Sequence, residues 1–270
     1  MPSLSALMTV YHRIDPAELA AALQSLTAQT RPADEVVIVE DGPIGDQLHE
    51  IIDAFVAATE GARVVRLPDN LGSGPASQAG LETITSEFTA RLDADDVAHP
   101  ARFATQLAYV EAHPEIDVLG TAVQEFTDSP GDGQKVRSLP ETHGEIAKYA
   151  LINSPINNPS VMLRTERADR VGGYRDVLHM EDYDLYARLL ADGARFHNLP
   201  EPLTYFRTST SQFERRTQGM WRAERQMQRN LVSYGLISRP RAVFNLVART
   251  AYRLLPAGLL TRVYGALFHK

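Results

Sequence analysis

Hydrophobic residues in the first 126 positions follow two alternating patterns. Short runs rich in Val, Ile and Leu recur between longer segments whose apolar residues repeat every three or four positions. The short runs predict buried strands, and the longer segments predict amphipathic helices. The predicted strands are residues 4–11, 35–39, 62–67, 88–92 and 116–126. Because strands that alternate with helices form βα units, this pattern predicts an α/β fold with a mainly parallel sheet flanked by helices.

Polar residues follow three of these strands at their carboxyl ends. Thr9 and Tyr11 end the first strand, Asp41 follows the second, and Asp93 and Asp95 follow the fourth. Ligands of open α/β sheets bind in the crevice beyond the carboxyl ends of the strands, so these side chains should converge. A strand-end Tyr and an Asp-Gly turn each also have a purely structural interpretation.

The segment that follows the fourth strand places three carboxylates, Asp93, Asp95 and Asp96, within four positions. Buried carboxylates are costly unless something neutralises them, and a hard divalent cation shared with phosphate oxygens does so. The cluster therefore predicts a metal site for a diphosphate. An Asp-rich turn is the alternative, and Asp96 is either a further ligand or the cap of the next helix.

The composition is that of an ordinary globular protein, and the absence of Cys excludes disulfides and thiolate metal sites. The N-terminus has no basic region or cleavage site, so we expect no signal peptide. The net charge of −7 is unevenly distributed, since residues 1–214 hold 16 Lys and Arg against 33 Asp and Glu, whereas residues 215–270 hold 11 against one. An acidic body argues against nucleic acid as the ligand. A basic tail suits an anionic surface, such as the cytoplasmic face of a membrane.

The basic tail alternates cations with apolar residues from position 239 onward. This pattern predicts a pair of interfacial helices with a break near Pro256 and Gly258. Arginines interrupt every apolar run of about 20 residues, the length that a bilayer requires. The alternative is a helical cap that packs on the rest of the chain or on a second subunit of a homo-oligomer.

Several short motifs, in this order and spacing, resemble the inverting glycosyltransferases of family 2, which have the GT-A fold. The resemblance covers nearly the whole chain. The motifs are Thr9-Val10-Tyr11, Glu40-Asp41-Gly42, Asn70-Leu71-Gly72, Asp93-Ala94-Asp95-Asp96, Pro100-Ala101-Arg102-Phe103, Pro159-Ser160, Gly172-Gly173-Tyr174 and Glu181-Asp182.

The resemblance implies roles for the strand-end residues. Thr9, Tyr11 and Asp41 would hold the nucleoside, with the Asp41 carboxylate accepting a hydrogen bond from the base. Asp93 and Asp95 would be the Asp-x-Asp pair of the family. Asp95 is then the expected direct ligand of Mg²⁺ or Mn²⁺, and Asp93 lies at the ribose or the metal. We expect a nucleotide-sugar donor, with UDP as the nucleotide and dTDP as the alternative.

An inverting transfer also needs a base for the acceptor hydroxyl. Glu181 and Asp182 open a predicted helix, where acids are favoured by the helix dipole whatever their function. The resemblance implies that Asp182 is the base and that Glu181 orients it or the acceptor. Arg215 and Arg216 are suited to clamp a diphosphate, although a solvated arginine pair is the commoner arrangement.

The sequence departs from the family pattern at a few positions. Glu40 stands where Asp is usual, and Gln78 stands where Asn is frequent, which leaves a contact of Gln78 with the diphosphate in doubt. The turn at Asn157 either faces the acceptor or is a structural Asx turn.

These observations predict a metal-assisted glycosyltransferase that acts on a saccharide acceptor, carried on a lipid, at the inner face of the membrane. We expect a catalytic domain at residues 1–213, with a nucleotide-sugar half (1–126) and an acceptor half (136–213), followed by the basic helical region (214–270). A degenerate nucleotide-sugar-binding scaffold subunit is one alternative. A sugar-1-phosphate nucleotidyltransferase is another, although residues 11–15 lack the glycines that its first loop requires.

Overall fold

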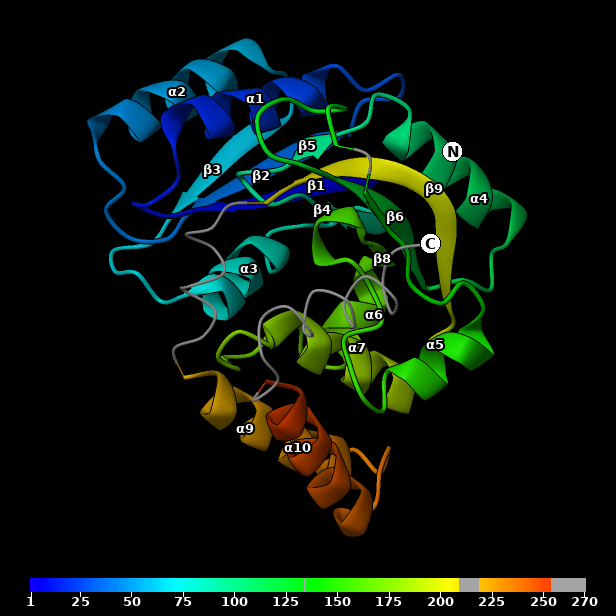
Figure 1. The fold of residues 1–270 in the computed structure, drawn as a ribbon. Helices are drawn as coiled ribbons and strands as arrows, with labels where there is room; N and C mark the ends of the chain where they lie inside the picture. Colours follow the sequence, from blue (N-terminus) through cyan, green and yellow to red (C-terminus); the bar gives the residue numbers. More distant parts are fainter. Residues whose placement is uncertain (134, 209–218, 254–270) are drawn as a thin grey trace.

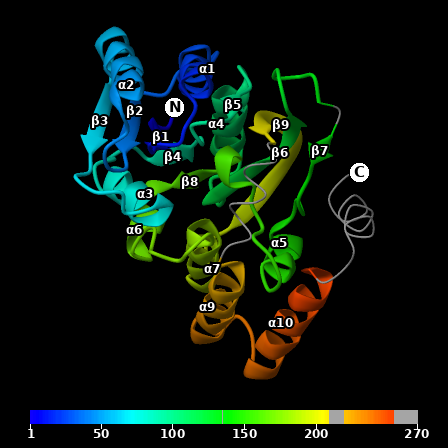
Figure 2. The same ribbon diagram turned by 60° about the vertical axis from the view of Figure 1, so that its left-hand side comes forward.

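The computed structural model describes residues 1–133, 135–208 and 219–253, and its strands form one mixed sheet between helices (Figures 1 and 2). The strands are β1 (Leu4–Val10), β2 (Glu35–Glu40), β3 (Ala62–Arg66), β4 (Phe88–Arg91), β5 (Val97–Ala98), β6 (Val118–Phe126), β7 (Val136–Arg137), β8 (Met162–Arg164) and β9 (Phe196–Arg207). The helices are α1 (Pro16–Thr27), α2 (Asp46–Ala58), α3 (Ser73–Leu81), α4 (Arg102–Ala112), α5 (His143–Tyr149), the 3-10 helix η1 (Asn158–Ser160), α6 (Thr165–Arg170), α7 (Glu181–Ala191), α9 (Met220–Ser233) and α10 (Arg239–Arg253).

The sheet has the strand order β3-β2-β1-β4-β8-β6-β9-β5, with β7 paired to β6. Strands β1 to β4 pair with one another in parallel, as predicted. Beyond them the sheet is mixed, because β8 runs antiparallel to both β4 and β6 while β6 and β9 are parallel. The chain moves from β1 to β2 and β3 on one side and returns to β4 on the other. This reversal of strand order opens a crevice at the carboxyl ends of β1 and β4.

Helices cover both faces of the sheet (Figure 1). On one face, buried residues such as Leu19 of α1, Ile52 of α2 and Phe103 of α4 pack on the sheet. On the other, Leu81 of α3 and Leu185 of α7 do the same. The apolar stripes found in the sequence therefore face the core, which accounts for the position of these helices.

Helix α9 packs beside α7, and α10 packs on α9, rather than on the sheet (Figure 2). The Asp184 carboxylate on α7 is fully buried, pairs with Arg188 at 2.8 Å, and accepts hydrogen bonds at 2.7 Å from Asn230 Nδ2 and Tyr234 Oη. This buried polar contact fixes α9 to the α/β body, and α10 is held by Asn245, whose Nδ2 donates to the Leu151 carbonyl and to Gln228 of α9. Their inner side is thus a helical cap, one of the two arrangements that the sequence left open.

Some expected features of the tail lie outside the described residues. These are the Arg215 and Arg216 pair and the break near Pro256 and Gly258. None of the described helices is long and apolar enough to cross a bilayer.

Candidate active site

A cleft of about 1240 Å³ opens where the carboxyl ends of β1, β2 and β4 meet the first turn of α7. The structure brings to this cleft every expected site residue within the described parts of the chain. They are Thr9, Tyr11, Asp41, Asp93, Asp95, Glu181 and Asp182. Residues far apart in sequence therefore share one cavity, as the rule for the ends of parallel strands predicts.

Asp41 organises the loop on the β2 side of the cleft. Its carboxylate accepts hydrogen bonds from the backbone N–H groups of Leu71 and Gly72, at 2.7 and 3.0 Å, and its carbonyl accepts one from Asn70 Nδ2 at 3.0 Å. Gly42 follows with φ +78°, and a Cβ there would lie 2.4 Å from the Asn70 nitrogen. The Asp-Gly pair thus ties this loop to the start of α3. Each carboxylate oxygen keeps a second lone pair, which is compatible with the expected bond to a base.

A buried cation, Arg91, lies under the acid cluster. Its Nε donates to Asp93 Oδ1 at 3.0 Å, and its Nη2 lies 3.4 Å from Thr9 Oγ1 and 3.3 Å from Ser73 Oγ. Burial works against the charge of Arg91, but Asp93, Tyr174 and Glu181 together outweigh it and raise the pKa of the guanidinium. Arg91 therefore stays cationic, and it orients Asp93 beside Thr9.

Asp96 is buried at the far side of the same cluster. Its Oδ1 accepts a hydrogen bond from the Arg207 backbone N–H at 2.8 Å, whereas its Oδ2 has no hydrogen-bond partner among the described residues. Burial, reinforced by the charges of Asp95 and Asp93, raises the pKa of Asp96 well above the usual range. Helix α4 begins at Arg102 with Ala101 in the cap position, so Asp96 does not cap that helix. Asp96 therefore adds to the cluster a buried carboxyl group whose ionisation the fold disfavours.

A hard divalent cation fits this donor set. Asp93 and Asp95 line the cleft, and their ligand atoms are carboxylate oxygens, which Mg²⁺ and Mn²⁺ prefer. Such ions commonly take one or two carboxylates and complete their shell with substrate phosphates. Within the described ranges, no three or more His, Cys, Asp or Glu side chains are grouped to hold a metal by themselves.

Without a divalent cation, Asp96→Asn is expected to raise the Tm at neutral pH and to lose that advantage in acid. The raised pKa means that ionising Asp96 costs the folded protein more than the unfolded chain, whose Asp pKa is about 3.9. Below that pH both states hold the proton, so the cost vanishes. Asn keeps the oxygen that accepts from Arg207.

The measurement is thermal unfolding of both proteins in EDTA across a pH series. A gain of 1 kcal/mol corresponds to a rise of about 2 to 4 °C in Tm. A Tm difference that stays constant from acid to neutral pH would contradict the assignment of a buried, charge-disfavouring site to Asp96.

Glu181 and Asp182 lie in the first turn of α7 and line the cleft together with the strand-end residues. Both are partly exposed to the cleft. A Cβ on Gly74 would lie 3.2 Å from Glu181 Cβ, so this glycine lets the start of α7 approach α3. Tyr174 is buried near Asp182, and burial raises the pKa of its phenol to about 12. Two acids of α7 thus line the same cleft as the strand-end residues.

Two residues of uncertain role have structural contacts. Gln78 Oε1 accepts a hydrogen bond from the Tyr174 backbone N–H at 2.7 Å, and its side chain fills the space beside Gly173. Gln78 therefore joins α3 to the turn before α7 and is not among the residues that line the cleft. Asn157 does line it, but its side chain bonds to Arg137 and to the Thr121 carbonyl at 2.9 Å each.

Comparison with known proteins places the chain in a family. The profile described as glycosyl transferase family 2 matches residues 5–170, from β1 to the end of α6. The chain belongs to glycosyl transferase family 2. This family 2 glycosyltransferase is an enzyme of the hexosyltransferase type.

Two curated relatives align with the family 2 enzyme over almost their full length. The amylovoran biosynthesis glycosyltransferase AmsE of Erwinia amylovora is 34% identical over 261 residues, which is 96% of this chain and 97% of the relative. The UDP-Gal:alpha-D-GlcNAc-diphosphoundecaprenol beta-1,3-galactosyltransferase of Escherichia coli is 30% identical over 264 residues, covering 97% and 95%.

A solved structure supports the same fold. The mannosyltransferase PcManGT from Pyrobaculum calidifontis, in complex with GDP-Man and Mn²⁺, superposes with a TM-score of 0.66 at 18% identity, covering 98% of this chain and 80% of that one. The glycosyltransferase described here therefore has the GT-A fold, as expected from its motifs.

Proposed function

We propose that this glycosyltransferase moves a sugar, with inversion, from a UDP donor to a lipid-linked saccharide in bacterial polysaccharide synthesis, at the inner face of the membrane. The observation that supports this most is the pairing of two acid groups in one cleft. Asp93 and Asp95 lie at the end of β4, and Asp182 lies in the first turn of α7, in the same cleft. One group serves the leaving diphosphate and the other serves the acceptor.

The reaction is a single in-line displacement. The acceptor hydroxyl oxygen forms a bond to the anomeric carbon while the bond from that carbon to the phosphate oxygen breaks, and the electron pair leaves with the nucleoside diphosphate. Asp182 accepts the hydroxyl proton, and Glu181 positions the acceptor beside it. Because the attack comes from the face opposite the leaving group, the configuration inverts.

The donor side is prepared by the strand ends. Tyr11 and Asp41 receive the nucleoside, and Arg91 holds Asp93 in place. Asp95, with Asp93, would hold Mg²⁺ or Mn²⁺, which offsets the charge that develops on the leaving diphosphate. A general acid on that side is then unnecessary.

Relatives support the proposed substrates. The Escherichia coli enzyme is named for a UDP-Gal donor and a diphosphoundecaprenol acceptor, and the Erwinia amylovora enzyme for amylovoran biosynthesis. PcManGT has the same fold and is a complex with GDP-Man and Mn²⁺, which supports a nucleotide sugar and a divalent ion as the ligands. Because Asp41 and Tyr11 contact the nucleoside rather than the sugar in this proposal, they bind the nucleotide without fixing the hexose.

Calorimetric titration of the purified protein with UDP, dTDP and GDP, each with and without Mn²⁺, tests the donor half of the proposal. We expect UDP to bind and the ion to strengthen that binding. Product configuration tests the other half, since proton NMR of the glycoside formed on a short lipid-diphosphate saccharide distinguishes inversion from retention. No binding of any nucleotide overturns the proposed donor site, nucleotide binding without transfer favours a scaffold subunit, and a product of retained configuration overturns the displacement.

A further inference from the structure

The outward sides of α9 and α10 are strongly cationic. Arg222, Arg225 and Arg229 are exposed on α9, and Arg239 and Arg241 are exposed on α10. Glu224 is the one acid in the sequence of these two helices, and it is buried and paired with Arg249 at 2.6 Å. The described outer surface of this helix pair therefore carries no exposed carboxylate to balance its arginines.

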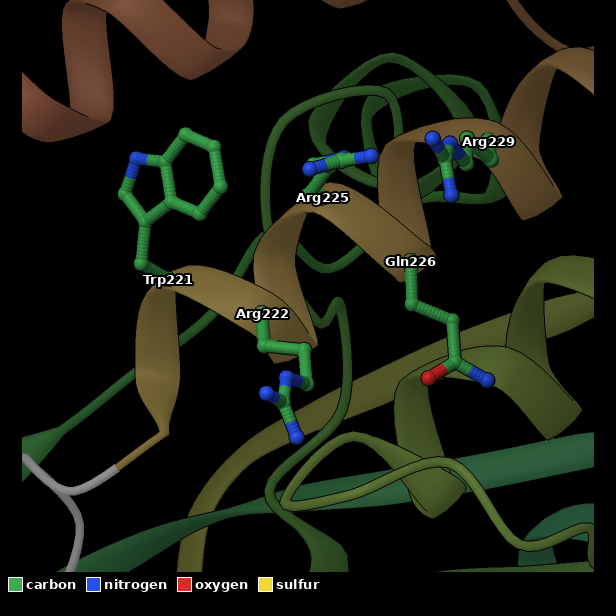
Figure 3. Close-up of a pocket in the computed structure, with 5 residues that line it drawn as sticks. All are labelled: Trp221, Arg222, Arg225, Gln226 and Arg229. Atoms are coloured by element: carbon green, nitrogen blue, oxygen red, sulfur yellow. The ribbon is translucent and has the colours of Figure 1, made fainter.

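Large apolar side chains lie among these cations. Trp221 is 53% exposed on α9, and Val243, Phe244 and Val247 are 61 to 63% exposed on α10. The Arg225 guanidinium lies 5.6 Å from the Trp221 ring centroid, at a shallow groove of about 470 Å³ on α9 (Figure 3). Arg241 lies at the same distance over Phe244. Exposed apolar side chains rimmed by charge mark a surface that contacts a partner.

The inner sides of the same helices are already occupied. Asn230 and Tyr234 bond to Asp184 of α7, and Gln228 bonds to Asn245 at 2.9 Å between the two helices. The helix pair is thus held in one orientation, with its cationic and apolar sides turned away from the body. Met220 and Arg249 of this pair also line the active-site cleft, so the surface adjoins the wall of that cleft.

We propose that the outer sides of α9 and α10 bind an anionic lipid surface and hold the cleft beside it. This proposal rests on the proposed function, because a lipid-linked acceptor would then reach the cleft within the same membrane. Arginines pair with lipid phosphates while Trp221 and Phe244 enter the boundary between headgroups and acyl chains.

The charge of the surface selects lipid over the other candidate occupants. A second copy packed symmetrically through this face would bring the same arginines against these. Residues 254–270 add Arg262 and Lys270 and no acid, so they do not complement it either. A bilayer that contains acidic headgroups supplies the missing negative charge, and the apolar side chains add binding that salt does not screen.

The test is co-sedimentation of the full chain with vesicles of phosphatidylcholine alone or mixed with phosphatidylglycerol. We expect binding only to the mixed vesicles, weakened by added salt. The triple variant Arg222→Gln, Arg225→Gln, Arg229→Gln should lower the vesicle partition coefficient by about 100-fold, since each arginine near such a surface contributes about fivefold. The matched control, Lys135→Gln, Arg170→Gln, Arg195→Gln, removes three cations elsewhere and should partition like the natural chain.

Phe244→Ser separates the apolar contribution, because it should weaken vesicle binding equally at low and high salt. Equal partitioning of the two triple variants, or no binding to mixed vesicles, overturns the proposal. So does a stable dimer in light scattering that Phe244→Ser disperses. Calorimetric titration with UDP in the absence of vesicles keeps the two questions apart, since the triple variant should bind UDP as the natural chain does.

Discussion

Asp182→Asn is expected to lower kcat by about 10²- to 10⁴-fold, the usual contribution of a positioned general base. The amide has the shape of the carboxylate but cannot take the proton of the acceptor hydroxyl. Binding of UDP should be unchanged, because Asp182 belongs to α7 and not to the strand ends that are proposed to receive the nucleoside. The measurement is sugar transfer under saturating donor and acceptor, with UDP affinity determined separately by calorimetry.

A matched control is Asp176→Asn, which removes one exposed carboxylate from the segment before α7 and is not among the cleft residues. It should retain full transfer. Asp182 also contributes to the first turn of α7, but losing that helix-dipole interaction costs only about 0.3 to 1 kcal/mol, so the fold should persist. Unimpaired transfer by the Asp182 variant would remove the residue from the role of base and direct attention to Glu181.

The regular elements of the first half could be predicted because burial imposes a simple period on them. Strand β2, covered on both faces, contains the unbroken apolar run 36–39, and α1 shows its buried stripe at Leu19, Leu23 and Leu26. The gathering of Asp41 and Asp93 follows from the same reasoning, since parallel strands end at one edge of the sheet. The local sequence pattern therefore predicted both the strands and helices of the first half and the residues that meet at the cleft.

Features that depend on distant partners were not predictable in the same way. Strand β5 has two residues and exists through pairing with β9, where Val97 faces Tyr205. That pairing carries the chain past Asp96 before α4 begins, which is why the interpretation of Asp96 as a helix cap was wrong. The hydrophobic repeat along the sequence cannot reveal a strand of two residues whose partner strand is more than a hundred positions away.

The partners of buried charged residues could not be predicted from the sequence either. Arg91 lies in an apolar run, and nothing adjacent to it in sequence indicates that Ser73, Ser77 and Thr9 receive its guanidinium. The same holds for Asp184, whose partners on α9 and beyond are more than 40 positions away. Burying such charges is tolerable only with their full set of partners, so their role becomes visible when the fold brings those partners together.

Asp95→Asn is expected to abolish the strengthening of UDP binding by Mn²⁺ and to reduce transfer by about 10³-fold, because an ion at a leaving diphosphate contributes several kcal/mol. The backbone carbonyl of Asp95, which accepts a hydrogen bond from Arg207 Nε at 2.9 Å, is untouched by the substitution, so the loop should keep its path. Calorimetry with UDP in Mn²⁺ and in EDTA is the measurement. The natural chain should lose affinity in EDTA, whereas the variant should show the same low affinity in both.

The control is Asp69→Asn, which removes an exposed carboxylate outside the cleft and should respond to Mn²⁺ as the natural chain does. If the Asp95 variant still binds UDP more tightly with Mn²⁺, the ion is held elsewhere, and the buried carboxyl group of Asp96 would be the next group to test.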